Sequence, residues 1–125
     1  MTLFDSTVLI AHLRGVDAAT ALLLEAVRAR DAACSVLTRV EVEGGMRSVE
    51  RAAVGRLFGS LKLEPVTDAV ARRAGQHLRS YRSSHPGIDL TDYVIAATAE
   101  LLGAQLVTLN VRHYPMVVGL EPAFD

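Results

Sequence analysis

Two hydrophobic periodicities alternate along the chain. Short, continuous apolar runs are separated by longer stretches in which apolar residues recur every three or four positions, as on one face of an α-helix. The short runs predict buried strands at residues 2–4, 33–36, 63–66 and 106–109. The longer stretches predict helices at about residues 8–15, 17–30, 38–47, 49–61, 67–81 and 90–102. A weak edge strand is predicted at 117–120, between Pro115 and Pro122.

This order of elements predicts an α/β fold. Strands that alternate with helices of about ten or more residues favour a mostly parallel sheet, here of four to five strands, with helices on both faces. The 125 residues are expected to form one domain, residues 1–125, because the length leaves no room for a second core. Functional sites in such sheets gather at the carboxyl ends of the strands.

Composition narrows the interpretation only slightly. Half of the residues are hydrophobic and 5% are aromatic, with no Trp, so the core is built from aliphatic side chains. Cys34 is the only cysteine, which excludes an intrachain disulfide and predicts a small buried side chain. The longest early apolar run, residues 8–11, is too short for a signal peptide or a membrane span. We therefore expect a cytoplasmic protein with no membrane partner.

Acidic side chains come together at the predicted functional edge of the sheet. Asp5 follows the first strand, Glu41 lies after the second, and Asp89 and Asp92 begin a helix. Carboxylates packed together repel one another unless a cation neutralises them. Mg²⁺ prefers oxygen ligands and is usually held by one or two carboxylates, water and substrate phosphate. The pattern therefore predicts hydrolysis of a phosphodiester with the help of a divalent metal.

Each acid also has a purely structural interpretation. Residues 38–41 read as a capping box, Asp5 or Ser6 can cap the first helix, and Asp89 or Thr91 can cap the helix that carries Asp92. Capping explains each residue separately, but it gives no reason for all of them to lie at one end of the sheet. Their convergence favours the metal site.

Other kinds of site find little support. The chain lacks G-x-G-x-x-G and G-x-x-x-x-G-K-[ST], which argues against dinucleotide and nucleoside triphosphate sites. A receiver domain would need a lysine after its last strand, and Lys62 is in the wrong place. A haloacid-dehalogenase-like phosphatase would need an acid where Thr7 stands. The four histidines show no metal-ligand spacing.

The basic residues leave two interpretations open. The net charge is −1, and of the 13 basic residues only Lys62 is lysine. Arginines are well suited to bidentate phosphate contacts, but genomic composition explains their excess equally well. Those closest to the predicted acidic edge either guide RNA phosphates or are simply solvated; they are Arg14, Arg39, Arg47 and Arg112.

Four stretches, taken together, resemble the motifs of PIN-domain ribonucleases, and most of all those of the VapC toxins of bacterial VapBC toxin–antitoxin systems. They are LFDSTVLI (3–10), SVLTRVE (35–41), DYVIAATA (92–99) and LVTLNVRHY (106–114). Each motif alone is weak. The four occur in the family's order, however, and the resemblance covers nearly the whole chain.

The resemblance implies a PIN-like three-layer α/β/α sandwich and an endoribonuclease that depends on Mg²⁺ or Mn²⁺. It also implies a cognate VapB-like antitoxin and a homodimer. Asp5 and Asp92 match the acids expected to ligate the metal, and Glu41 matches a third acid that acts directly or through water. Asn110 matches a fourth catalytic position, where the family carries Asp or Asn. His113 stands where many members carry an acid.

Further roles follow from the same resemblance. The hydroxyls of Ser6, Thr7 and Thr108 would orient the carboxylates, and Asp89 is a candidate fourth acid. Alanines in 17–30 and 92–99 serve either a dimer contact or the core. The rival hypothesis is a catalytically silent PIN-fold module that binds RNA or protein, and the intact acids argue against it.

Overall fold

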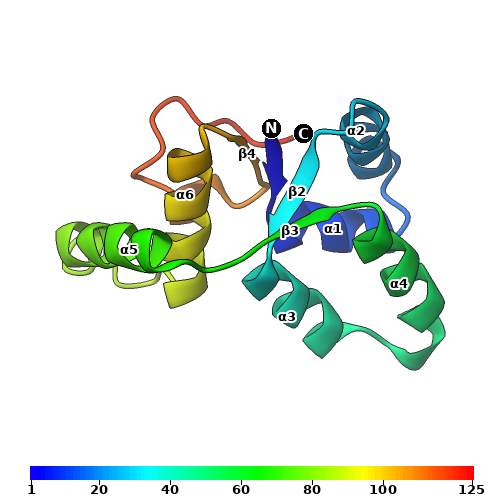
Figure 1. The fold of residues 1–125 in the computed structure, drawn as a ribbon, viewed down its shortest axis with the longest axis horizontal. Coiled ribbons are helices and arrows are strands. Elements are labelled where there is room, and N and C mark those ends of the chain that lie inside the picture. The colour runs from blue at the N-terminus through cyan, green and yellow to red at the C-terminus, as the bar shows by residue number, and fades with distance from the viewer.

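The structure is a computed structural model that describes residues 1–125. Four parallel strands form one sheet in the order β3-β2-β1-β4, and helices cover both of its faces (Figure 1). The strands are β1 (Thr2–Phe4), β2 (Ala32–Ser35), β3 (Lys62–Glu64) and β4 (Gln105–Val107). The helices are α1 (Ser6–Leu13), α2 (Asp17–Arg28), α3 (Val36–Gly45), α4 (Arg51–Gly59), α5 (Asp68–Tyr81) and α6 (Leu90–Leu102), with 3-10 turns η1 (Ser48–Glu50) and η2 (Val111–His113).

Alternation along the two central strands builds a core on each face of the sheet. Phe4 and Cys34 pack with α1, α2, α3 and α4, whereas Leu3 and Ala33 pack with α6 on the other face. Successive side chains of a strand point to opposite faces, so each strand serves both cores. The result is the predicted α/β/α sandwich with a four-stranded sheet. Burial raises the pKa of the Cys34 thiol to about 12, as expected of an inert core residue.

Local signals in the sequence set several helix boundaries. The Thr67 side chain accepts a hydrogen bond from the backbone N–H of Val70 and begins α5, as its sequence predicts. Gly103 ends α6 with a φ of +63°, a left-handed conformation that suits glycine. Ser35 caps α3 by accepting from the N–H of Leu37, so α3 begins two residues before the predicted start.

Several predicted details are wrong. The proposed capping box of residues 38–41 does not exist, because Ser35 is the cap and Thr38 lies inside α3. The predicted helix 49–61 is divided into η1 and α4. Residues 117–120 form no strand, because this segment turns at Gly119, where φ is +73°.

The alanines of α6 are more completely buried than those of α2, where Ala18 and Ala21 are exposed. In α6, Ala96, Ala97 and Ala99 are buried inside the chain, against the sheet and α5. These alanines therefore serve the core.

No single helix is long and apolar enough to cross a membrane. Helices α1 and α2 pass that test only as a pair, and the pair is bent by 113°.

Candidate active site

Asp5 stands where β1 ends and α1 begins. Its backbone N–H donates to the Val107 carbonyl (3.1 Å), which fixes this residue against β4. Its Oδ1 accepts from the backbone N–H of Thr7 (3.1 Å) and from the Thr7 hydroxyl (2.5 Å), so Asp5 is the N-cap of α1. The capping interpretation is thus correct for this acid. It accounts for only one of the two carboxylate oxygens.

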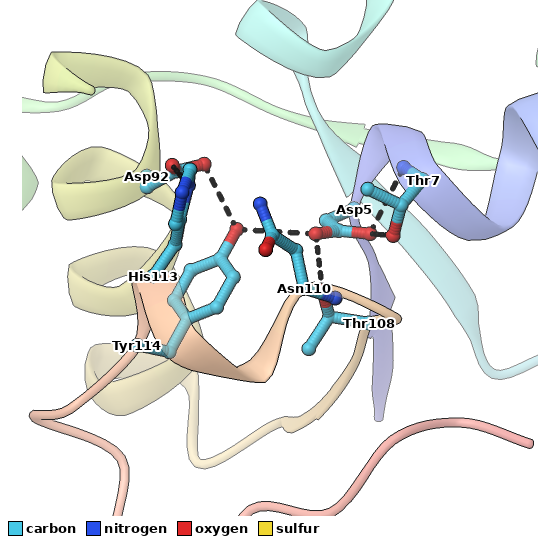
Figure 2. Close-up of polar contacts among 7 residues, drawn as sticks. All are labelled: Asp5, Thr7, Asp92, Thr108, Asn110, His113 and Tyr114. Carbon is cyan, nitrogen blue, oxygen red and sulfur yellow. Dashed lines mark hydrogen bonds and ion pairs between the residues drawn. The ribbon is translucent and has the colours of Figure 1, made fainter. Parts of the chain in front are cut away.

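The other oxygen of Asp5 faces the end of β4 and the segment that follows. Oδ2 accepts from the Thr108 hydroxyl (2.5 Å) and from the Tyr114 hydroxyl (3.3 Å), as Figure 2 shows. Only 3% of Asp5 is exposed. Burial raises the pKa of Asp5 even though the hydrogen bonds from Thr108, Thr7 and Tyr114 act to lower it. Thr7 and Thr108 therefore orient this carboxylate, as the sequence predicts.

Asp92 reaches the same place from the first turn of α6. Its Oδ2 lies 2.7 Å from Nδ1 of His113, and its Oδ1 accepts from the Tyr114 hydroxyl (3.2 Å). A single phenol therefore bridges Asp5 and Asp92 (Figure 2). Asp89 is the N-cap residue of α6 by position, but its side chain makes no capping hydrogen bond. Asp89 therefore does not cap α6 through its side chain, and the capping interpretation is not supported there.

Glu41 approaches the pair from α3 and is exposed. Desolvation raises the pKa of this carboxyl, and the negative charges of Asp92 and Asp5 raise it further. The nearby Ser6 side chain acts in the opposite direction. Glu41 is thus close enough to the two aspartates to feel their charge, and no arginine or lysine forms an ion pair with it. We call Asp5, Glu41 and Asp92 the acidic site.

The segment after β4 supplies the remaining polar groups. The backbone N–H of Asn110 donates to the Thr108 hydroxyl (2.9 Å), while the Asn110 amide side chain forms no hydrogen bond with the protein. Sequence reasoning gave no role to His113 or Tyr114, although both belong to the fourth motif. Their contacts with Asp92 join residues 21 and 22 positions apart, and no local pattern reveals such pairs.

The donor set is suited to a hard cation, although the acids do not all converge on one point. No group of three or more His, Cys, Asp or Glu side chains is arranged to hold a metal ion. Mg²⁺ takes only one or two carboxylates and fills the rest of its shell with water and substrate oxygens. The paired oxygens of Asp5 and Asp92, with the charge of Glu41 beside them, satisfy that requirement.

The acidic site lies outside the cavities of the protein. The largest cavity, about 470 Å³, lies between β4 and the C-terminal tail, and none of the five cavities is lined by Asp5, Glu41 or Asp92. Enclosed pockets are typical of small-molecule ligands. The acidic site is not an enclosed pocket, and its exposed member, Glu41, faces solvent, which is better suited to a polymer whose phosphate approaches from outside.

The arginines predicted near this edge differ in their pairing. Arg14 and Arg47 both pair with Glu50, and Arg39 pairs with Glu43 (2.5 Å). Arg112, in η2 beside His113, is exposed and forms no ion pair. Of these four arginines, only Arg112 has its guanidinium free of an acidic partner.

Comparison with known proteins shows the family of this chain. Residues 2–116 match the PIN domain family, and this span contains all three residues of the acidic site. The chain belongs to the PIN-domain family. Within it, this PIN domain is 52% identical to ribonuclease VapC10 of Mycobacterium tuberculosis over 99% of its own length and 93% of that protein. It is 45% identical to ribonuclease VapC19 of the same organism, over 99% of this chain and 100% of that protein.

Solved structures share the fold of this PIN domain. A toxin–antitoxin complex from Klebsiella pneumoniae matches with a TM-score of 0.78 at 23% identity, covering 100% of this chain and 99% of that one. VapBC2 from Rickettsia felis, bound to a DNA fragment from its promoter, matches with a TM-score of 0.74 at 17% identity over 99% and 98% of the two chains. The predicted PIN-like sandwich is therefore confirmed.

Proposed function

We propose that this chain is an endoribonuclease that depends on Mg²⁺ or Mn²⁺, the toxin of a type II toxin–antitoxin pair. The observation that carries the proposal is the pairing of Asp5 and Asp92 across one phenol, with Glu41 close enough for their charges to raise its pKa beyond the effect of desolvation. Such a cluster has no arginine or lysine to neutralise it. A divalent ion supplies that charge and, when bound, activates water and stabilises the leaving oxygen of a phosphodiester.

We assign separate tasks to the chain's own residues. Asp5 and Asp92 hold the cation, and Glu41 contacts it directly or through water. Thr7 and Thr108 keep the Asp5 carboxylate in one orientation, since their hydroxyls lie 2.5 Å from its two oxygens. His113 does the same for Asp92 from 2.7 Å.

We assign two further residues to the substrate. The Asn110 amide, uncommitted within the protein, is placed to hydrogen-bond the substrate or its water. Arg112 is placed to meet an RNA phosphate, because it is exposed and unpaired and is the chain neighbour of His113, which contacts Asp92. Neither residue adds to the negative charge that the cation offsets.

The partners are inferred from relatives. Two M. tuberculosis proteins that are 52% and 45% identical to this chain are named ribonucleases, and two structural neighbours are a toxin–antitoxin complex and VapBC2. We infer RNA as the substrate, a VapB-like antitoxin as the inhibitor, a homodimer as the assembly, and the cytoplasm as the location. We also infer that residues 1–125 act as one domain.

Incubation of the purified chain with RNA and Mn²⁺ or Mg²⁺ tests the proposal. We expect internal cleavage that stops when EDTA removes the metal and that resumes when the metal is restored. Co-expression with the product of the adjacent upstream gene should suppress the cleavage. Intact RNA in every metal, together with no heat of Mn²⁺ binding in calorimetry, would instead support the catalytically silent module.

A further inference from the structure

The Tyr114 hydroxyl lies between the two acids that we assign to the metal. Its oxygen is 3.3 Å from Oδ2 of Asp5 and 3.2 Å from Oδ1 of Asp92, and no other side chain hydrogen-bonds both acids. A hydroxyl has one proton, so it can donate at full strength to only one of the two carboxylates at a time. Both contacts are also longer than the usual O–H···O distance of about 2.7–2.8 Å.

A count of donors shows why this hydroxyl matters to a cation. A carboxylate accepts about four hydrogen bonds. Asp5 already accepts from the Thr7 N–H, from the Thr7 and Thr108 hydroxyls, and from Tyr114. Its acceptor positions are therefore full. Asp92 accepts only from His113 and Tyr114 and keeps free positions.

One of the four donors must release Asp5 before a cation can bind it, and Tyr114 is the weakest. The hydroxyls of Thr7 and Thr108 lie at 2.5 Å and the Thr7 N–H at 3.1 Å, compared with 3.3 Å for the phenol. Tyr114 is also the donor with another carboxylate available, because Asp92 lies within reach.

The phenol ring itself is fixed. Tyr114 is 1% exposed and packs in the core cluster that includes Leu3, Ile95 and Leu106. Only the hydroxyl proton can redirect without disturbing this packing. The buried ring keeps the oxygen beside both acids when the proton redirects.

We propose that the Tyr114 hydroxyl is a placeholder for the cation. In the metal-free protein it fills the last acceptor position of Asp5, and it yields that position and donates to Asp92 alone when a divalent ion binds. Tyr114 is thus a positioning residue that stabilises the empty site and competes with the metal. This inference rests on the proposed metal-dependent function.

Tyr114→Phe removes the hydroxyl and keeps the ring. An interaction that stabilises only the metal-free state opposes metal binding. Because this variant lacks the hydrogen bond from Tyr114 to Asp5, it should bind Mn²⁺ about three- to tenfold more tightly in calorimetry. Its metal-free melting temperature should fall by a few degrees, and this deficit should shrink at saturating Mn²⁺. A phenol that only supports the fold would lower the melting temperature without tightening the binding of Mn²⁺.

Tyr93→Phe is the matched control. Tyr93 is also 1% exposed and lies next to Asp92 in α6, but its hydroxyl has no hydrogen-bond partner. Its loss should leave the Mn²⁺ affinity unchanged.

A measurement on the wild-type chain covers the case in which Tyr114→Phe does not fold. With ¹³C-labelled tyrosine, the Cζ resonance of Tyr114 should move on Mg²⁺ titration, while those of Tyr81 and Tyr93 stay in place. Unchanged or weaker Mn²⁺ binding by Tyr114→Phe, or an unmoved Tyr114 resonance, would overturn the placeholder. If the wild-type chain binds no divalent ion, the proposed function fails first and the placeholder fails with it.

Discussion

Helix α6 carries an acid near each end, and the rest of the molecule surrounds the two in opposite ways. Near its C-terminal end, Glu100 accepts from Nε and Nη2 of Arg73 (2.9 and 2.7 Å) and lies 2.8 Å from Nε2 of His77. We call these three residues the Glu100 network. The hydrogen bonds from Arg73 are the main reason why the pKa of Glu100 falls to about 2. The chain supplies its own cation here, and it joins α5 to α6.

Near the N-terminal end, Asp92 belongs to the acidic site, whose environment has the opposite effect. Burial raises the pKa of Asp5, and desolvation with the charges of Asp92 and Asp5 raises that of Glu41. No arginine or lysine forms an ion pair with these acids, and the only basic side chain in contact with them is His113, 2.7 Å from Asp92. Charge pairing in the Glu100 network is therefore complete within the chain, whereas the function that we propose assigns the neutralisation of the acidic site to a cation from outside. The predictions below test this contrast.

The largest effect should be on RNA cleavage. Asp5→Asn preserves the shape of the side chain, and the Thr108 and Tyr114 hydroxyls can reverse to accept from the new amide. Loss of the charge that holds the metal should nevertheless reduce cleavage by at least about a hundredfold. Glu100→Gln, the control from the Glu100 network, should change the rate by less than about twofold, since surface charges of this kind contribute little. Equal losses in the two variants would contradict the contrast.

The next effect concerns stability within the acidic site. Asp5→Ala removes the cap of α1 and leaves the buried Thr108 hydroxyl without its acceptor, so it should reduce the metal-free free energy of unfolding by about 2–4 kcal/mol. Glu41→Ala removes an exposed acid that its neighbours repel, and should change that energy by no more than about 0.5 kcal/mol. Urea denaturation measures both. A large loss in Glu41→Ala would mean that Glu41 is a structural residue.

A smaller effect separates the two regions by pH. The raised pKa of Asp5 and Glu41 means that the folded chain holds protons that the unfolded chain has released, so their contribution to stability is lost as the pH rises through the folded pKa values. Glu100 has the opposite sign, and its contribution is lost as the pH falls from the ordinary value of 4.5 towards about 2.

Melting curves of the metal-free chain, recorded at pH values below and above the pKa values of these carboxyls, test the two opposite pH dependences. Glu41→Gln should reduce the stability that is lost as the pH rises through the folded pKa values of Asp5 and Glu41. Glu100→Gln should reduce the stability that is lost as the pH falls towards the pKa of Glu100. Saturating Mn²⁺ should abolish only the loss of stability that accompanies the rise in pH. If stability were still lost on raising the pH in saturating Mn²⁺, the cation would not neutralise the acidic site.

The smallest effect concerns the arginine beside the acidic site. Arg112→Ala should raise KM for RNA by about three- to fivefold, leave kcat unchanged, and reduce the salt dependence of binding, because one phosphate contact is lost. Arg72→Ala is the matched control, since Arg72 is an exposed arginine of α5 that already pairs with Asp68 (2.9 Å). Equal effects of the two substitutions would remove Arg112 from the proposed RNA contact.

Hydrophobic periodicity was sufficient to predict the order of elements and the layers. The apolar runs of β1 and β2 and the stripe of α5 give unambiguous periods, and the cap at Thr67 and the stop at Gly103 are local signals. The boundaries of α3 were wrong because Ser35 and Thr38 are both good caps, and the sequence does not say which one is used. Pro115 and Pro122 signalled an interruption, but they did not exclude an edge strand between them.

The acids of the site could be named from the sequence because Asp5 follows a strand, Glu41 lies in the helix after a strand, and Asp92 lies in the first turn of a helix, all at one edge of the sheet. What holds them could be predicted only in part. Thr7 is adjacent to Asp5 in the chain, whereas Tyr114 meets Asp5 and Asp92 across 109 and 22 positions. Such contacts depend on how the segment after β4 folds back over the sheet, and residue spacing does not encode that path.

A crystal of the chain soaked in Mn²⁺ and measured at the manganese absorption edge tests directly whether Asp5 and Asp92 hold one divalent cation. We expect an anomalous peak about 2.2 Å from carboxylate oxygens of both Asp5 and Asp92, with water filling the remaining ligand positions. A map with no peak there, or with its only peak beside another acid such as Glu100, would contradict this expectation.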